Sequence, residues 1–275
     1  VKLGKGFSIF AGKQCTAYGG IEFDLNPIEI YEYSDMIENM SNFMTGLNIG
    51  YDINAHQQLN LQILDSRNGS FNKTYGVETE DGEQPAIESG KLPLVYTLNW
   101  NGNFNDIFKT RWSASIMNEA KDKNLYYFAF GNELNLNKFN MFLDFMYSKE
   151  GIDRKGIMTG ITGSMEGHNA FDAGYFSMVT KLNYRFLPKW NAFVKGMYET
   201  ASLTKQQGDL EKGKYRTAWG YFAGVEFYPM NTNLHFFLTY VGRSYDFTAR
   251  AKALGQENYS TNRVSVGFIY QLPMF

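Results

Sequence analysis

Basic side chains alternate with apolar ones in several segments of this 275-residue sequence, which would place positive charges together on one face of an extended chain. Lys181 and Arg185, for example, are in phase with each other and out of phase with Leu182 and Tyr184. In an extended chain, alternate positions share one face. A face lined by fixed cations attracts anions such as phosphate without covalent chemistry. The positions assigned to this face are Lys109, Arg111, Lys181, Arg185, Lys195, Arg216, Arg243 and Arg263.

Carboxylates share the same phase, but there are fewer of them. They are Asp52, Asp144, Glu199 and Glu226. Eight cations against four carboxylates predict a wall that attracts anions mildly. The alternative is that these charges only keep the face hydrated and pair with one another, and the sequence leaves both interpretations open.

A second acidic group is concentrated in residues 15–42. The same segment holds many apolar residues, among them Ile21, Ile30 and Met36, which is more than a solvated loop exposes without a surface to pack on. We therefore expect the segment to bend against the basic face, with its carboxylates opposite the cations. These carboxylates are Glu22, Asp24, Glu29, Glu32, Asp35 and Glu38.

Residues for catalysis or metal binding are poorly organised. The three histidines, His56, His168 and His235, have no metal-ligand spacing, and Ser164 lacks the glycine of a nucleophile elbow. The acidic run at residues 78–88 could ligate Ca²⁺, but without EF-hand spacing a solvated external loop is the better interpretation. We predict no catalytic residue, no metal and no cofactor, and therefore not an enzyme.

The elements that position these residues are strands with a period of two. In residues 263–272, Val264, Val266 and Phe268 share one face, while Arg263 and Ser265 lie on the other. About twelve such strands of roughly 9 to 13 residues can be assigned, which matches the length that crosses a bilayer on a tilt. Their ranges are 5–14, 43–53, 58–66, 94–101, 108–116, 124–134, 139–147, 174–186, 190–202, 215–228, 234–242 and 263–272.

The connections between these strands alternate between short and long. Short turns are expected at 54–56, 102–106, 135–138, 187–189 and 230–233. Long connections are expected at 15–42, 67–93, 149–173, 203–214 and 246–259, with a brief exception at 119–123. Such sorting predicts an up-and-down antiparallel barrel with short turns on one rim and long loops on the other, as in outer-membrane barrels.

Composition excludes several other classes. A mean hydropathy of -0.37 and the absence of any apolar run of about 20 residues exclude a helical membrane protein. A net charge of -2 with scattered cations argues against nucleic-acid binding. A soluble β-sandwich would not sort its loops by length or place aromatic residues near strand ends, as at Tyr51, Trp100, Trp190, Tyr215, Trp219 and Tyr228.

One stretch carries a family resemblance. Residues 11–40 read AGKQCTAYGGIEFDLNPIEIYEYSDMIENM and are followed by FMTGLNIGYDI. This stretch resembles outer-membrane porins of the Bacteroidetes type, related to the phosphate-selective porin O/P family. The resemblance implies a sixteen-stranded barrel around a water-filled pore, usually trimeric, whose third external loop folds inward.

The sequence accounts for about twelve strands, fewer than the sixteen that the resemblance implies, so we expect N-terminal strands to be lacking. Residues 15–42 would then be the third external loop and the constriction. Pro273 and Phe275 are out of phase with the preceding strand, although an aromatic end is typical of such barrels.

The sequence thus predicts one β-barrel domain over residues 1–275 in the bacterial outer membrane. Its expected function is passive diffusion of small hydrophilic solutes, including anions such as phosphate, with membrane lipid and further copies of the chain as partners. The alternative is a plugged barrel whose long loops bind a ligand or a surface partner.

Overall fold

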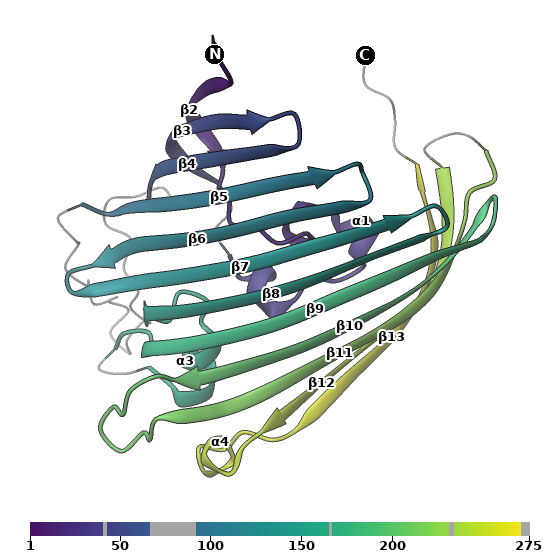
Figure 1. Cartoon of the computed structure of the whole chain (residues 1–275). Coiled ribbons are helices and arrows are strands. Elements are labelled where there is room, and N and C mark those ends of the chain that lie inside the picture. Colours follow the sequence, from purple (N-terminus) through teal and green to yellow (C-terminus); the bar gives the residue numbers. More distant parts are fainter. Residues whose placement is uncertain (41–42, 67–91, 165–166, 231–233, 271–275) are drawn as a thin grey trace.

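The computed structural model describes residues 1–40, 43–66, 92–164, 167–230 and 234–270, and their strands form one antiparallel sheet of thirteen. Strand order follows chain order, so each strand pairs with its neighbours in the sequence (Figure 1). The strands are β1 (Lys2–Gly4), β2 (Phe7–Cys15), β3 (Phe43–Asn54), β4 (Gln57–Asp65), β5 (Leu94–Phe104), β6 (Phe108–Ala120), β7 (Lys123–Leu136), β8 (Phe139–Ile152), β9 (Phe171–Leu187), β10 (Trp190–Leu203), β11 (Gly213–Phe227), β12 (Leu234–Phe247) and β13 (Tyr259–Tyr270).

The predicted all-β, up-and-down arrangement is confirmed, and each of the twelve predicted ranges overlaps a strand, although residues 271–272 of the last range lie outside the described residues. Within the described residues the sheet is strongly curved but does not close, because β1 and β13 form its two edges. The predicted strand 5–14 is corrected at its start. Lys5 and Gly6 have φ of 48° and 81°, a left-handed turn that separates β1 from β2.

The predicted division into two rims is also observed in the described residues. Short turns join β3 to β4, β5 to β6, β7 to β8 and β9 to β10 at one rim, and the long connections gather at the other (Figure 1). Most of the connection between β4 and β5, including the acidic run at 78–88, lies outside the described residues, as do Pro273 and Phe275.

Short helices occupy the long connections, and the period-two pattern did not predict them. They are η1 (Glu22–Asp24), α1 (Pro27–Ile30), α2 (Asp35–Glu38), α3 (Ile157–Thr162) and α4 (Ala249–Ala253). Helix α1 begins where the Asn26 and Glu29 side chains form a capping box, with Pro27 in the first turn. None of the helices in the described residues is both long and apolar enough to span a membrane.

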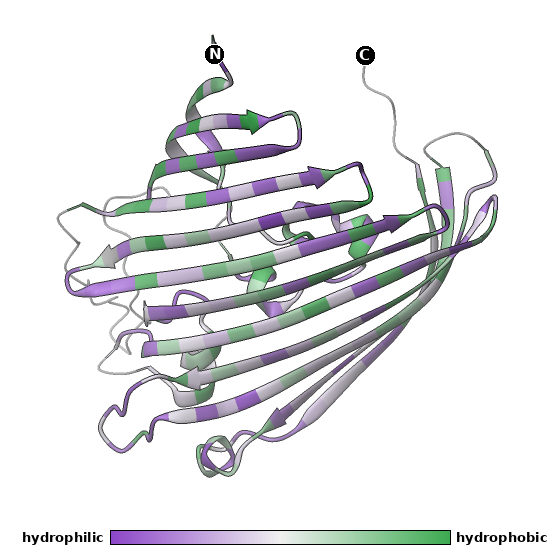
Figure 2. Cartoon of the chain, in the orientation of Figure 1, coloured by the Kyte–Doolittle hydropathy of each residue, from purple (hydrophilic) through white to green (hydrophobic). Residues whose placement is uncertain are grey.

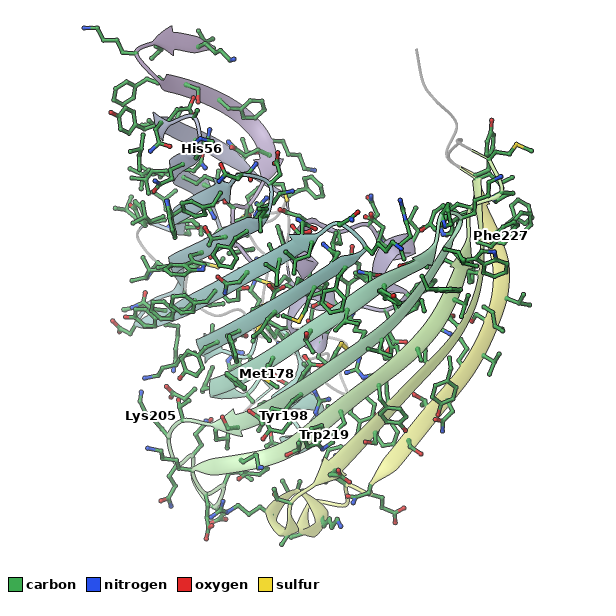
Figure 3. The ribbon with its side chains drawn as sticks, turned by 45° about the vertical axis from the view of Figure 1, so that its right-hand side comes forward. His56, Met178, Tyr198, Lys205, Trp219 and Phe227 are labelled. Atoms are coloured by element: carbon green, nitrogen blue, oxygen red, sulfur yellow. The ribbon has the colours of Figure 1, made fainter. Side chains whose placement is uncertain are left out.

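The two faces of the sheet differ as the alternation predicts. Along each strand, hydrophobic and hydrophilic residues alternate in bands (Figure 2). Tyr198 and Trp219 lie side by side on the convex surface, with ring centroids 4.7 Å apart, and Met178 lies beside them (Figure 3). Polar residues such as Ser177 and Glu199 alternate with this aromatic group and are buried on the concave face.

Tyr215 departs from this alternation. We placed it among the aromatic residues near strand ends, and its side chain is buried, with only 1% exposed. The register between β10 and β11 jumps from Ala201 opposite Arg216 to Ser202 opposite Lys214, which leaves Tyr215 as the extra residue of a β-bulge. The bulge lets two successive side chains, Tyr215 and Arg216, both point away from solvent.

The convex face can be tested at β13. Phe268 is 66% exposed and its ring lies 5.9 Å, centroid to centroid, from that of Phe236 on the adjacent strand, whereas Ser265 is half-buried on the other face. We expect Phe268→Arg to lower the free energy of unfolding in lipid by about 2 to 4 kcal/mol, and Ser265→Arg to change it little. Refolding into lipid vesicles measures both. The reverse order would show that the two faces of β13 are assigned the wrong way round.

Candidate functional site

Residues 16–40 leave β2 and lie on the concave side of the sheet, where η1, α1 and α2 are stacked against the inner wall (Figure 1). Tyr18, Ile21, Met36 and Ile37 are at most 6% exposed, and they belong to one apolar cluster with residues of every strand from β3 to β12. Burial of this apolar surface is the main force that holds the segment in place. We call residues 16–40 the inner segment.

One end of the inner segment is fixed to β7 and β8. The backbone N–H groups of Ile21 and Glu22 donate to the Asp144 carboxylate at 2.9 and 2.7 Å. At Gly131 a β-carbon would lie 2.7 Å from the α-carbon of Gly20, so only glycine permits this approach. Asp144 was predicted as a wall carboxylate, and its contacts identify it as an acceptor for the inner segment.

Glu22 makes the most buried charge pair of the site. Its Oε1 lies 2.6 Å from the Lys195 ammonium, and both side chains are inaccessible to solvent. Ser34 donates from its backbone N–H and hydroxyl to the same carboxylate, at 3.2 and 2.5 Å. Lys195 also donates to the Glu32 carbonyl at 2.6 Å. The pair is therefore well hydrogen-bonded, which a buried ion pair requires to be tolerated.

Arg243 is the centre of a second, larger charge network. Its guanidinium nitrogens lie 2.9 Å from Asp35, 2.9 Å from Glu199 and 3.2 Å from Glu32. Arg216 contacts the other oxygen of Asp35. Glu199 also accepts from the Met36 backbone N–H at 3.2 Å. Carboxylates of the inner segment and of the wall thus share the same cations.

Three further wall cations contact the inner segment at η1, at α1 and just after α1. Arg111 pairs with Asp24, and the Lys181 ammonium donates to the Glu29 carbonyl. Arg263 on β13 lies 3.6 Å from the Glu32 carboxylate. These contacts extend from β6 to β13, so the inner segment bridges much of the concave face.

Tyr31, the residue that follows α1 in the inner segment, contacts β10 and β11. Its ring is stacked on Phe193 with centroids 4.9 Å apart, and its hydroxyl donates to Glu226 at 2.6 Å. Burial, reinforced by the Glu226 carboxylate, raises the pKa of the Tyr31 phenol well above its usual range. The phenol therefore stays protonated and remains a donor at physiological pH.

Not every predicted residue takes part in these contacts. In the described part of the chain, the side chains of Lys109 and Arg185 form no ion pair with the inner segment, and Glu38 is exposed without one. Glu29 uses its carboxylate to accept from Asn26 at the start of α1. Asp52 accepts from Gln58 at 2.8 Å near a short turn.

A second buried network, between β8 and α3, was not predicted from the sequence. Lys155 pairs with Glu150 at 2.7 Å, and Asp153 accepts from the Thr159 backbone and hydroxyl at 2.6 and 2.7 Å and from Tyr175. Burial, then the nearby Glu150, raises the pKa of Asp153. This network holds α3 so that Met158 and Ile161 join the apolar cluster under the inner segment.

The histidines are dispersed. His56 lies in the turn between β3 and β4, His168 in the connection after α3, and His235 on β12. Among the described residues, no group of three or more His, Cys, Asp or Glu side chains could hold a metal ion. The arrangement instead offers fixed charges of both signs around an ordered segment on the inner wall.

Comparison with known proteins identifies the family. Residues 1–272 match the family described as phosphate-selective porin O and P. The chain belongs to this family. No curated protein sequence matches the porin.

Solved structures share its fold. The outer membrane channel DcaP of Acinetobacter baumannii superposes with a TM-score of 0.63 at 10% identity, covering 94% of the porin and 70% of DcaP. OmpT, an outer membrane protein of Vibrio cholerae, gives 0.55 at 11% identity, covering 96% and 76%. OccAB3 of A. baumannii gives 0.54 at 14% identity, covering 98% and 65%.

Family membership and fold together give the coarse function. The porin is a bacterial outer-membrane protein with a lipid-embedded β-sheet, and it acts as a channel for small solutes. Family and fold indicate a channel rather than an enzyme.

Proposed function

We propose that the porin is a passive diffusion channel whose constriction is formed by residues 15–42 opposite the basic wall. The observation that carries the proposal is the set of contacts from the inner segment to cations on β6, β9, β10, β11, β12 and β13. A segment that is bonded across a concave wall narrows any aqueous passage enclosed by that wall. Lys109 and Arg185, which form no ion pair with the inner segment among the described residues, would add positive charge to the lining of the passage.

The charges around the constriction nearly balance. Cations that contact the inner segment or its neighbours are Arg111, Lys181, Lys195, Arg216, Arg243 and Arg263. Carboxylates in the same contacts are Glu22, Asp24, Glu32, Asp35, Asp144, Glu199 and Glu226. Six cations against seven carboxylates give a small net charge but a strong local field. Preference for anions such as phosphate, which the family name suggests, then depends on the cations outside these pairs.

The finer architecture is part of the same proposal. We infer a closed barrel of sixteen strands, a Bacteroidetes-type source and assembly into a homotrimer. Curvature of the sheet and its exposed convex apolar face support closure in a bilayer, because a lipid-exposed sheet edge leaves backbone groups unpaired.

A plugged barrel is the second candidate, and one observation favours it. The inner segment and α3 pack Met36, Ile37, Met158 and Ile161 into a single apolar cluster on the inner wall. Planar-bilayer recordings separate the two functions. Discrete open-channel steps support the channel, whereas silence from protein that circular dichroism shows to be folded and inserted supports the plug.

Charge selectivity gives a further prediction. Replacing Lys181, Arg185 and Arg243 by Gln leaves Glu32, Asp35 and Glu226 less compensated, so the reversal potential in a salt gradient should shift toward cations. A matched triple Gln variant at the exposed Lys205, Arg250 and Lys252 removes the same charge from the outer loops and should keep the original selectivity. Unchanged selectivity in the first variant would discard the role of the wall cations.

A further inference from the structure

A cavity of about 440 Å³ lies between α1 and the short-turn ends of strands β7 to β12. Its lining includes Asn140, Asn183, Asn191, Glu226 and Tyr228, together with apolar side chains of the inner segment. The volume falls within the range of small-molecule sites. The inner segment forms one side of the cavity, so a solute that passes the segment toward the short-turn rim meets this lining next.

Three asparagines form a continuous hydrogen-bonded row along the cavity wall. Asn191 donates to Asn183 at 3.3 Å, Asn183 donates to Asn140 at 3.0 Å, and Asn140 donates to Glu133 at 2.7 Å. Asn191 also donates to Glu226 at 2.8 Å. The row therefore crosses β7, β8, β9, β10 and β11, with one side chain from each strand and a carboxylate at both ends. It is an ordered polar strip perpendicular to the strands.

The row offers more acceptors than donors to a ligand. Asn191 uses both of its amide hydrogens in the row, and Asn140 uses its own on Glu133 and Asn135. Each carbonyl oxygen has two lone pairs, and Asn140 and Asn183 each use one of them within the row. The free capacity is thus several carbonyl lone pairs, the remaining carboxylate lone pairs and one amide hydrogen of Asn183.

An acceptor-rich strip selects ligands that carry O–H donors. A phosphate at neutral pH offers acceptors and at most one donor, so it matches the row poorly. The charged side chains that line the cavity are Glu29, Glu133 and Glu226 with Lys138, Lys181 and Arg185, three of each sign, so the lining offers an anion no net positive charge. Hydroxyl groups donate and accept, so several on one molecule can match consecutive asparagines. Beside the strip, the Tyr228 and His235 rings lie 5.1 Å apart and provide an apolar surface with polar edges.

We propose that this cavity is a subsite for an uncharged polyhydroxylated solute of the size of a mono- or disaccharide, bound along the row Asn140, Asn183 and Asn191. The inference rests on the proposed channel function, because it places the subsite on the path of the solute. It adds a substrate class to that function.

The test is the saturable reduction of ion current by maltose in planar bilayers. Maltose should lower the mean conductance of the porin with a defined half-saturating concentration. A polyethylene glycol of similar size, which lacks a run of hydroxyls, should lower it without saturation. Inorganic phosphate at constant ionic strength should not compete with maltose. Competition by phosphate would overturn the inference in favour of an anion site.

Variants locate the effect. Asn183→Ala interrupts the row and should raise the half-saturating concentration of maltose about tenfold, as expected when a ligand hydrogen bond and the order of the row are both lost. The matched control is Asn132→Ala, because Asn132 accepts from Trp112 away from the cavity. Asn183→Ser keeps a hydroxyl and is the second variant if the first does not fold. Equal maltose affinity in all variants would overturn the inference.

Failure of the channel function can be told apart from failure of the subsite. Normal conductance steps without saturable maltose block would reject the subsite and leave the channel intact. If no steps appear, titration calorimetry of maltose into the folded porin in detergent decides the subsite alone, with heat that Asn183→Ala removes supporting it and no heat rejecting it.

Discussion

Deletion of residues 21–36 should raise the single-channel conductance of the porin about twofold or more and admit larger uncharged solutes. The deletion removes the residues that contact Asp144, Lys195 and Arg243, and with them the part of the chain that covers the inner wall. Cys15 and Phe43 are opposite each other in the β2–β3 pair, so the remaining residues can still close the connection. The sheet should therefore fold without the segment. Conductance in planar bilayers and a size series of polyethylene glycols measure both effects.

A matched deletion of residues 206–209 controls for loop loss in general. These residues lie in the connection between β10 and β11, at the rim of the long loops, where Gln207 accepts from the Phe171 backbone N–H rather than contacting the inner segment. Removing them should leave conductance nearly unchanged. If the deletion of 21–36 also left it unchanged, the constriction hypothesis would be rejected, because the segment would then not limit the passage.

The second large effect is expected at the Glu22–Lys195 pair. Lys195→Met leaves the Glu22 carboxylate buried without its cation, and such a loss costs about 3 to 5 kcal/mol. The cost should appear as a lower free energy of local opening for the inner segment. Hydrogen exchange of the backbone amides in residues 18–38, measured in lipid nanodiscs, reports this opening.

Two comparisons make the Lys195 result specific. The double variant Glu22→Gln with Lys195→Met removes both charges and keeps an acceptor for Ser34, so most of the lost protection should return. Glu211→Gln breaks the ion pair between Glu211 and Arg250, whose side chains are 65% and 45% exposed, respectively. This substitution should lower the free energy of unfolding by only about 0 to 1 kcal/mol. An equally small effect at Lys195 would contradict the inaccessible position of the pair.

Much of the sheet was predictable because strand alternation is local. Val264, Val266 and Phe268 reveal a strand with one apolar face without any knowledge of the partner strands. Failures occurred where tertiary contacts override the period. Tyr215 sits in a bulge, and the short helices depend on caps and on burial against the wall rather than on a repeating pattern.

Less of the site could be predicted. The sequence brought out the wall cations and the carboxylates of residues 15–42, and their roles in pore lining and constriction stay predictions. It did not predict that Asp144 accepts from the backbone of the inner segment, because a carboxylate with a backbone partner has no motif. The asparagine row was also missed, since Asn140, Asn183 and Asn191 become neighbours only through the stagger of three strands.

Strand order in this sheet has a consequence for the sequence of folding events. Every strand pairs with the strand next to it in the chain, so the sheet can grow hairpin by hairpin with little loop-closure entropy to overcome at each step. The inner segment is the opposite case, because Glu32 reaches Arg243 across 211 residues. It emerges early in the chain, yet its partners on β12 and β13 exist only after the sheet is nearly complete. Docking of the inner segment is therefore a late event in assembly.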